Sequence, residues 1–290
     1  MTVSIIIVNF NGLRYTRQCL ESFFRYHDVK STEVIVVDNN STDGSQQELP
    51  QLFPFIHFIS LHNNVGFGGA NNVGAQRSTG RMLYFVNNDT VFYKESVSEL
   101  VKTLSSHNKY GIVAPKLLNE DHSFQLSFGQ FPTIQNEFET KNIAENYSLQ
   151  TSLDSSISIP IPKDWVSGAA LMIKREVFEE IGGFDERYFM YFEDVDLCRS
   201  AAKKGFQIFY VPSNTLIHLG GKSYGARDER ITVEYRKSQL LFYDKHNSLL
   251  QRLLVRVYIL MKFTAGLFRT KSRSAALAVI PLVFRSSNRQ

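Results

Sequence analysis

Five polar side chains fall where predicted strands end or in the loops that follow, and their types could bind a nucleotide, a diphosphate and a metal ion. They are Asp38, Asn64, Asp89, Asp194 and His218. In open α/β sheets, ligands bind beyond the carboxyl ends of the strands, so these side chains would share one rim. One such residue is unremarkable, whereas several that converge on one rim indicate an active site.

Asp89 follows the apolar run 82–86. A run that apolar, without alternation, predicts a strand buried on both faces, as in a parallel sheet covered by helices. A carboxylate at the end of such a strand can hold a divalent cation that takes its other ligands from phosphates. The alternative is a turn, because Asn and Asp bond their own backbone and commonly end strands.

Asp38 ends a second predicted strand, where its carboxylate can accept a hydrogen bond from a base or a ribose hydroxyl. An Asx-turn or a helix cap is the alternative. The glycine-rich run 66–72 resembles a phosphate loop, but it lacks the Walker lysine and the third glycine of the dinucleotide-binding spacing. Asn64 and the glycines after it are equally compatible with a backbone turn.

The acidic run 193–196 opens a predicted helix. Carboxylates in the first turn of a helix are stabilised by the helix dipole, so a purely structural role stays open. The functional interpretation makes Asp194 a general base that takes a proton from an incoming hydroxyl. His218, in a predicted loop beside glycines, is either a core or capping histidine or a metal ligand.

The elements that would position these residues alternate along the chain. Strands are predicted at 4–10, 33–37, 55–60, 82–87 and 110–115, with helices at 15–26, up to about 80, and at 95–107. This order predicts βαβ units and a mostly parallel, Rossmann-like α/β sheet flanked by helices. The polar stretch 132–158 predicts an insertion. A strand at 165–173, helices from 175 and at 193–204, a strand at 206–211 and a helix at 228–246 follow.

The charge of the chain is unevenly distributed. No acidic residue follows Asp244, while nine of the 32 lysines and arginines do, which leaves 23 basic against 28 acidic side chains in residues 1–244. From Leu249 to Phe268 the chain is apolar but interrupted by Arg252, Arg256 and Lys262, which argues against a transmembrane helix. The pattern predicts a basic amphipathic helix on an anionic membrane surface. A helix packed on the catalytic domain, or an oligomer contact, is the alternative.

The two cysteines have no paired-thiol spacing, which predicts a reducing compartment and neither a disulfide framework nor a zinc site. The amino terminus has no basic region or cleavage site, so no signal peptide is predicted. We therefore expect a cytoplasmic protein, held peripherally at the inner face of the cell membrane by its basic tail.

Five motifs occur in a fixed order and together resemble the family-two inverting glycosyltransferases with the GT-A fold, especially rhamnosyltransferase-like members. They are SIIIVNFNG (4–12), VIVVDNNSTDG (34–44), NNVGF (63–67), NND (87–89) and FEDVDLC (192–198). The resemblance spans about residues 2–246. It implies a GT-A catalytic domain at 1–246, with a nucleotide-sugar half at 1–116 and an acceptor half at 117–246. The basic helical tail would then be 247–290.

The resemblance also implies a role for each site residue. Asp194 would be the catalytic base, with Glu193 and Trp165 on the acceptor side. The residues that bind the nucleotide-sugar would be Asn9, Asp38, Asn64, Gly66 and Asn88. Asp89 and His218 would bind a divalent cation, Mg²⁺ or Mn²⁺. Asn87 stands where the family's Asp-x-Asp motif has its first carboxylate, which removes one charge from the metal site.

The implied activity is transfer of a sugar from a nucleotide-diphospho-sugar to a hydroxyl of a glycan or polyprenyl-diphosphate-linked acceptor, in bacterial surface polysaccharide synthesis. The preferred donor is dTDP-rhamnose, with other dTDP- or UDP-sugars possible, and no nucleic acid partner is expected. A nucleotidyltransferase is one alternative, but the segment 9–12 lacks the basic glycine-rich loop that such an enzyme would carry. A non-catalytic sugar-nucleotide-binding scaffold subunit is the other, supported only by Asn87.

Overall fold

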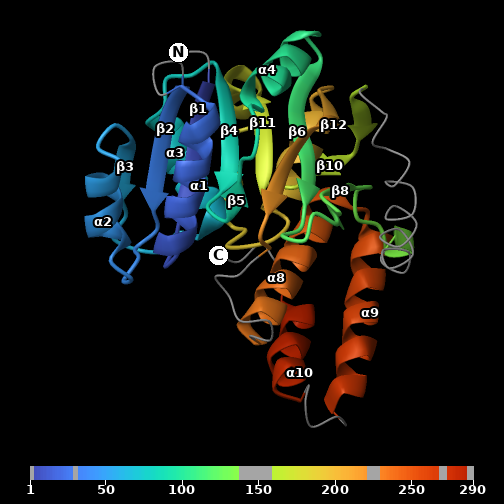
Figure 1. The fold of residues 1–290 in the computed structure, drawn as a ribbon. Coiled ribbons are helices and arrows are strands. Elements are labelled where there is room, and N and C mark those ends of the chain that lie inside the picture. Colours follow the sequence, from blue (N-terminus) through green and yellow to red (C-terminus); the bar gives the residue numbers. More distant parts are fainter. Residues whose placement is uncertain (1–2, 29–31, 137–158, 221–228, 268–272, 286–290) are drawn as a thin grey trace.

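The computed structural model describes residues 3–28, 32–136, 159–220, 229–267 and 273–285. A mixed sheet with the order β3-β2-β1-β4-β11-β6-β12-β5 forms its centre (Figure 1). The bounds are β1 (Val3–Asn9), β2 (Thr32–Asp38), β3 (His57–Ser60), β4 (Met82–Asn87), β5 (Thr90–Val91), β6 (Tyr110–Leu118), β11 (Ala170–Lys174) and β12 (Gln207–His218).

Of the seven neighbouring pairs in this order, four are parallel and three antiparallel. The parallel pairs are β3–β2, β2–β1, β1–β4 and β6–β12, whereas β11 is antiparallel to β4 and β6, and β5 to β12. Two short strands extend the sheet, β7 (Phe124–Gln125) and β9 (Ile161–Lys163). A separate pair joins β8 (Phe128–Gly129) to β10 (Trp165–Val166). The predicted mostly parallel α/β fold is confirmed.

The strands are apolar throughout because helices cover both faces. In β1, Ile5 and Ile7 pack on one face and Ile6 on the other, since side chains alternate along a strand. The helices α1 (Leu13–Tyr26), α2 (Ser45–Leu52) and α4 (Val97–Ser105) contribute to the first core. The second core includes α3 (Gly66–Gln76), α6 (Arg175–Glu180) and α7 (Glu193–Lys203).

The glycine-rich run 66–72 is helical, so it is not the phosphate loop that it resembles. It forms the first turns of α3, where its glycines allow close packing. A Cβ on Gly68 would lie 3.0 Å from Phe184 Cβ, and one on Gly74 only 2.5 Å from Ile6 Cγ2. Contact with the sheet and with the segment before α7 therefore favours glycine despite its low helix propensity.

Two strands differ from their predicted bounds. Strand β12 continues to His218, so this residue ends a strand instead of lying in a loop. The predicted strand 165–173 is two strands, β10 and β11, because the chain turns at Ser167–Ala169 between them. Most of the predicted insertion, residues 137–158, lies outside the described residues.

The chain ends in helices α8 (Glu229–His246), α9 (Leu249–Leu267) and α10 (Arg273–Val279), followed by a 3₁₀ turn at Ile280–Phe284. They lie together at one end of the molecule (Figure 1). Their apolar side chains form a third core that also contains Tyr188, Phe192 and Val195 from the segment around the start of α7. None of the described helices is long and apolar enough to span a bilayer.

Helix α9 differs from a surface helix that buries its apolar face and exposes its charged face. Arg256 turns inward, where its Nη2 lies 2.6 Å from Asp244 Oδ2 and its Nη1 donates to Val283 O at 2.9 Å. Val255 and Ile259 are buried beside it. The outer face of α9 instead carries exposed apolar side chains, which are Leu249, Leu250, Leu253, Leu254, Val257 and Met261. The helix is thus amphipathic, but one of its basic groups faces the protein.

Candidate active site

Asn9 and Asp38 are neighbours at the carboxyl ends of β1 and β2. Asn9 Nδ2 donates to Asp38 Oδ1 at 2.7 Å and to Ser41 Oγ at 3.0 Å. Asp38 Oδ2 accepts the Ser41 N–H and Gln46 Nε2, each at 2.9 Å. Asp38 has no exposed surface, so it fixes the loop after β2, and a base would reach its carboxylate by replacing the half-buried Gln46 amide.

Asn88 joins the same network from the end of β4. Its Nδ2 donates to Thr16 Oγ1 at 3.0 Å, and Thr16 in turn donates to Asn9 Oδ1 at 2.6 Å. Gly12 faces this amide so closely that a Cβ there would lie 2.2 Å from Asn88 Nδ2. The rim therefore needs a glycine at the start of α1 to admit Asn88.

Asn64 holds the turn that leads into α3. Its Oδ1 accepts the Gly66 N–H at 3.0 Å and Asn39 Nδ2 at 2.9 Å. Gly66 has a φ of +80°, and a Cβ there would lie 2.6 Å from Phe189 O. The turn is therefore glycine-dependent, and the amino terminus of α3, which favours anions, opens directly from it.

Asp89 and His218 meet at the opposite side of β4 from Asn9. Asp89 Oδ1 lies 3.1 Å from His218 Nε2, and both side chains are largely buried. His218 Nδ1 lies 2.7 Å from Gln125 Oε1, while Gln125 Nε2 donates to Asn119 Oδ1. Because that amide oxygen only accepts, Nδ1 carries a ring proton, and Nε2 is the ring nitrogen that faces Asp89.

These groups fit a divalent cation. A ring nitrogen and a carboxylate oxygen converge, and Asn87 Nδ2 lies 3.3 Å from the same His218 Nε2. Turning that amide over would present its oxygen to a shared ion, a reversal that leaves its shape unchanged. The described residues contain no group of three His, Cys, Asp or Glu side chains around a metal position, because the third donor here is an amide. Nitrogen with carboxylate and amide oxygen suits Mn²⁺ or Mg²⁺.

Asp194 lies in the first turn of α7, facing the turn between β10 and β11. Its Oδ2 accepts the Gly168 N–H and its Oδ1 the Val195 N–H, each at 2.8 Å. Burial raises the pKa of this carboxyl even though the two N–H groups oppose the shift. A carboxylate held by backbone donors, with its pKa raised toward neutrality, has the character of a general base.

Glu193 precedes it and is buried against the start of α3, where the Cβ position of Gly68 lies 3.8 Å from its own Cβ. Burial, and then the charge of Asp194, raises its pKa to about 8. Among the described residues its Oε2 has no hydrogen-bond partner. The raised pKa favours the protonated form of Glu193, which has an unpaired oxygen beside the predicted base.

One dipeptide connects the metal-type cluster to Asp194. The Gly168 N–H binds Asp194, and the next residue, Ala169, accepts the Asn87 N–H through its carbonyl at 2.9 Å. The structure thus brings Asp89, His218 and Asp194 around one short turn. Trp165 lies three residues before Gly168, and its Nε1 donates to Gln130 O at 2.9 Å.

Sequence patterns did not indicate several residues on which this arrangement depends. Gln125, Asn39, Thr16 and Gly168 belong to none of the catalytic groups that the motifs single out, and each acts through a hydrogen bond to a distant residue. Only Gly168 had a local signal, because it interrupts an apolar strand pattern.

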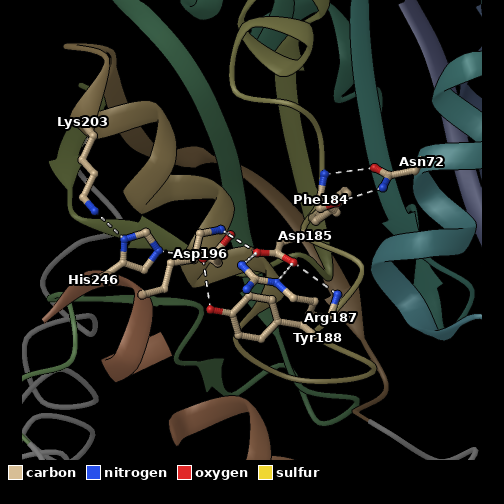
Figure 2. Close-up of polar contacts among 9 residues, drawn as sticks. Asn72, Phe184, Asp185, Arg187, Tyr188, Asp196, Lys203 and His246 are labelled. Carbon is tan, nitrogen blue, oxygen red and sulfur yellow. Dashed lines mark hydrogen bonds and ion pairs between the residues drawn. The ribbon is translucent and has the colours of Figure 1, made fainter. Parts of the chain in front are cut away.

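A charge network anchors the opposite side of α7 (Figure 2). Asp196 accepts Lys245 Nζ at 2.8 Å, His246 Nε2 at 2.7 Å and the Tyr188 hydroxyl at 3.1 Å. Lys245 also binds Asp185 at 2.7 Å, and this bond with that of Arg187 holds the pKa of Asp185 well below its usual range against the effect of burial. The end of α8 therefore fixes the helix that carries Asp194.

Comparisons with known proteins identify the family of this chain. The profile described as "Glycosyl transferase family 2" matches residues 4–182. The N-acetylglucosaminyl-diphospho-decaprenol L-rhamnosyltransferase of Mycobacterium tuberculosis is 30% identical over 240 residues, which cover 75% of this chain and 76% of the relative. Rhamnosyltransferase WbbL of Escherichia coli is 26% identical over 226 residues, 74% of this chain and 83% of the relative.

A solved structure resembles the fold. The crystal structure of GalNAc-T7 with UDP, GalNAc and Mn²⁺ superposes with a TM-score of 0.61 at 17% identity, over 84% of this chain and 50% of that chain. At this identity the likeness concerns the GT-A fold alone. The profile covers more than half of the residues and the mycobacterial relative most of the chain, so this protein belongs to glycosyl transferase family 2 and is a glycosyltransferase.

Proposed function

We propose that this glycosyltransferase is metal-dependent and inverting, with Asp194 as its base. The observation that carries the proposal is the single turn at Gly168–Ala169, which binds Asp194 on one side and Asn87 of the metal-type cluster on the other. A base and a diphosphate-binding cation must act on one sugar at once, and this turn gives them a shared rigid support.

The chemistry follows from these positions. A divalent ion bound by Asp89, His218 and the Asn87 amide would offset the charge of a leaving nucleoside diphosphate. Asp194 takes the proton from an acceptor hydroxyl, which attacks the anomeric carbon from the face opposite the diphosphate. Attack from that face inverts the configuration. Glu193, protonated and unpaired at Oε2, donates a hydrogen bond to the acceptor sugar.

The remaining predicted residues fit the donor. Asn9 and Asp38 would form the base and ribose end of the site, while Asn88, Asn64 and Gly66 shape the rim toward the diphosphate. Both relatives are named rhamnosyltransferases, which supports rhamnose as the transferred sugar in the proposed donor dTDP-rhamnose. The name of the mycobacterial relative includes a diphospho-decaprenol acceptor, which supports a lipid-diphosphate-linked glycan as the acceptor. In this proposal residues 1–116 bind the nucleotide-sugar, 117–246 the acceptor, and 247–290 form the tail.

The tail would bind the inner face of the cell membrane. Its outer surface on α9 is apolar, with Leu249 70% exposed and Met261 70% exposed. No acidic residue follows Asp244 in the sequence, although Asp244 itself pairs with Arg256. An exposed apolar helix face in a segment of net positive charge suits an anionic lipid surface.

Asp194→Asn tests the assignment. The amide keeps the shape of the side chain but cannot take a proton, so transfer should fall by at least about 100-fold. Calorimetry of dTDP, UDP and GDP binding, with and without Mn²⁺, should give the same affinity as for the wild type. Loss of nucleotide affinity together with transfer would contradict Asp194 as the base. Nucleotide binding by a wild-type protein that transfers no sugar to any acceptor would favour a scaffold.

A further inference from the structure

A pocket of about 540 Å³ lies beside the second half of α7, apart from the rim that holds Asp38 and Asp89. Residues 130–136, the second half of α7 and the junction between α8 and α9 form its walls. The polar groups that line it include Thr133, Asp164, Arg199, His246 and Asn247. No residue assigned above to the donor, the metal or the base belongs to it.

One guanidinium, that of Arg199, lines the pocket together with one carboxylate, that of Asp164. Arg199 stacks over the Phe131 ring at 4.5 Å, and its guanidinium has no hydrogen-bond or ion-pair partner among the described residues. Lys203, one turn further on α7, donates to His246 Nδ1 at 2.8 Å (Figure 2). Burial, together with the charges of Arg199 and Lys245, lowers the pKa of Lys203. The positive charges of Arg199, Lys203 and Lys245 therefore repel one another here.

The neighbouring acids are already engaged. Asp164 Oδ2 accepts the Phe131 N–H at 2.9 Å. Asp196 is 2% exposed and accepts bonds from Lys245, His246 and Tyr188. His246 is neutral in this arrangement, since its Nε2 donates to Asp196 and its Nδ1 accepts from Lys203. The five N–H donors of Arg199 remain available to an anion.

The pocket is connected to the active site by one extended segment. Asp164 lines the pocket, and four residues later the Gly168 N–H binds Asp194. Between them Trp165 donates to Gln130 O, which belongs to the pocket wall. Three residue steps separate Trp165 from Gly168 and span at most about 10 Å, since even extended chain rises about 3.3 Å per residue. This is the length scale of one sugar and the diphosphate attached to it.

Exposed apolar side chains follow the pocket wall along the chain. Asn247 lines the pocket, and α9 begins two residues later with Leu249 and Leu250, which are 70% and 65% exposed. The pocket therefore combines an unpaired guanidinium with a nearby leucine face. Few molecules other than a lipid attached to a phosphate present both features together.

We propose that this pocket binds the diphosphate of a lipid-diphosphate-linked sugar acceptor, with Arg199 as its main ligand. The acceptor sugar would then extend past Trp165 to Asp194, and the lipid would leave along α9. This inference rests on the proposed glycosyltransferase reaction, because that reaction supplies the acceptor. Arg199 binds the acceptor and takes no part in proton transfer.

The test uses the single tryptophan of the chain, Trp165, as its reporter. Farnesyl diphosphate is titrated in EDTA, so that binding at the metal-type cluster does not contribute, and tryptophan fluorescence is followed. Arg199→Gln should weaken this binding about tenfold or more, because hydrogen bonds to a charged group are lost. The affinity of Arg199→Lys for farnesyl diphosphate should lie between those of the wild type and Arg199→Gln.

Lys204→Gln is the matched control, because Lys204 directly follows α7 and its substitution also removes one positive charge. Lys204 is exposed and pairs with Glu180 at 3.5 Å, away from the pocket wall. The Lys204→Gln variant should bind farnesyl diphosphate with the wild-type affinity. An equal loss in both variants would overturn the proposal in favour of general electrostatic attraction.

Further titrations identify the source of the anion. Farnesol and inorganic pyrophosphate should each bind at least about tenfold more weakly than farnesyl diphosphate, because each lacks one half of the ligand. Vesicles of phosphatidylglycerol that compete as well as farnesyl diphosphate, in an Arg199-dependent way, would overturn the acceptor assignment in favour of a lipid headgroup.

The failure of this inference is distinguishable from failure of the proposed function. Arg199→Gln should keep the wild-type affinity for dTDP or UDP with Mn²⁺, and transfer to an alkyl glycoside acceptor that lacks a diphosphate. Only the KM for a diphosphate-linked acceptor should rise. If both KM values rise equally, Arg199 is structural. If no nucleotide binds, the proposed function fails while the fluorescence titration still decides whether the pocket holds a diphosphate.

Discussion

Glu193 makes the stability of this protein depend on pH in a defined direction. Its pKa is raised from 4.5 to about 8 because the carboxyl is buried and Asp194 lies next to it. The folded protein therefore binds a proton more tightly than the unfolded chain between these values. The contribution of this carboxyl to stability is full below about pH 4.5 and is lost as the pH rises through about 8.

Glu193→Gln removes that dependence, since the amide has the same shape and does not ionise. A pKa difference of this size corresponds to at most about 5 kcal/mol, at 1.36 kcal/mol for each pH unit. Because Asp194 titrates together with Glu193, we expect a gain of about 3 kcal/mol at the alkaline end. That gain raises the melting temperature by roughly 5 °C for a chain of this length, at about 2.1 cal/mol/K of unfolding entropy per residue.

Thermal unfolding followed by Trp165 fluorescence, between about pH 5 and about pH 8, measures this effect. The melting temperatures of the variant and the wild type should separate progressively as the pH rises, with the variant more stable. Glu180→Gln is the control. Glu180 is exposed at the surface, so this substitution should change the stability by no more than about 1 kcal/mol at any pH in the range. A constant difference across the range would refute the buried, protonated state of Glu193.

Two further predictions concern the supports of the site. Gly66→Ala should destabilise the protein by at least about 2 kcal/mol in urea unfolding and weaken nucleotide binding, because its Cβ would meet Phe189 O at 2.6 Å. Gly182→Ala is the comparison, since Gly182 also has a positive φ but nothing within 4 Å, and an equal loss would show that the backbone conformation alone matters. Asp196→Asn should cost about 3 kcal/mol, because the amide is uncharged and keeps only one acceptor oxygen, so that either Lys245 or His246 loses its hydrogen bond to this side chain. A loss no larger than that of Glu180→Gln would mean that the network contributes little to holding α7.

The sheet and the rim could be predicted because they depend on local patterns. The strands of Ile5 and Val36 are buried on both faces, and such strands have continuous apolar sequences whatever lies around them. Asn9 and Asp38 end adjacent strands, so their contact at 2.7 Å follows from the parallel register. Helix α7 likewise begins at the predicted acidic run.

The glycine-rich run and His218 depended on distant contacts. Glycine disfavours helices in isolation, and only the approach of Ile6 and Phe184 explains why residues 66–76 are helical. The register of β12 against β5, which pairs His218 with Thr90, extends that strand beyond its apolar part. Neither partner can be read from the local sequence.

The basic tail shows most clearly what a helical wheel omits. The wheel groups Arg252, Arg256 and Lys262 on one arc opposite apolar residues, which predicts a basic amphipathic helix on an anionic membrane surface. It carries no information on Asp244, which lies in the preceding helix and binds Arg256 at 2.6 Å. Once that ion pair forms, the arc near Arg256 must face the protein, and the leucine face turns outward. A membrane contact through α9 would therefore depend on apolar insertion more than on the arginines, and salt should weaken it less than it weakens a purely electrostatic contact.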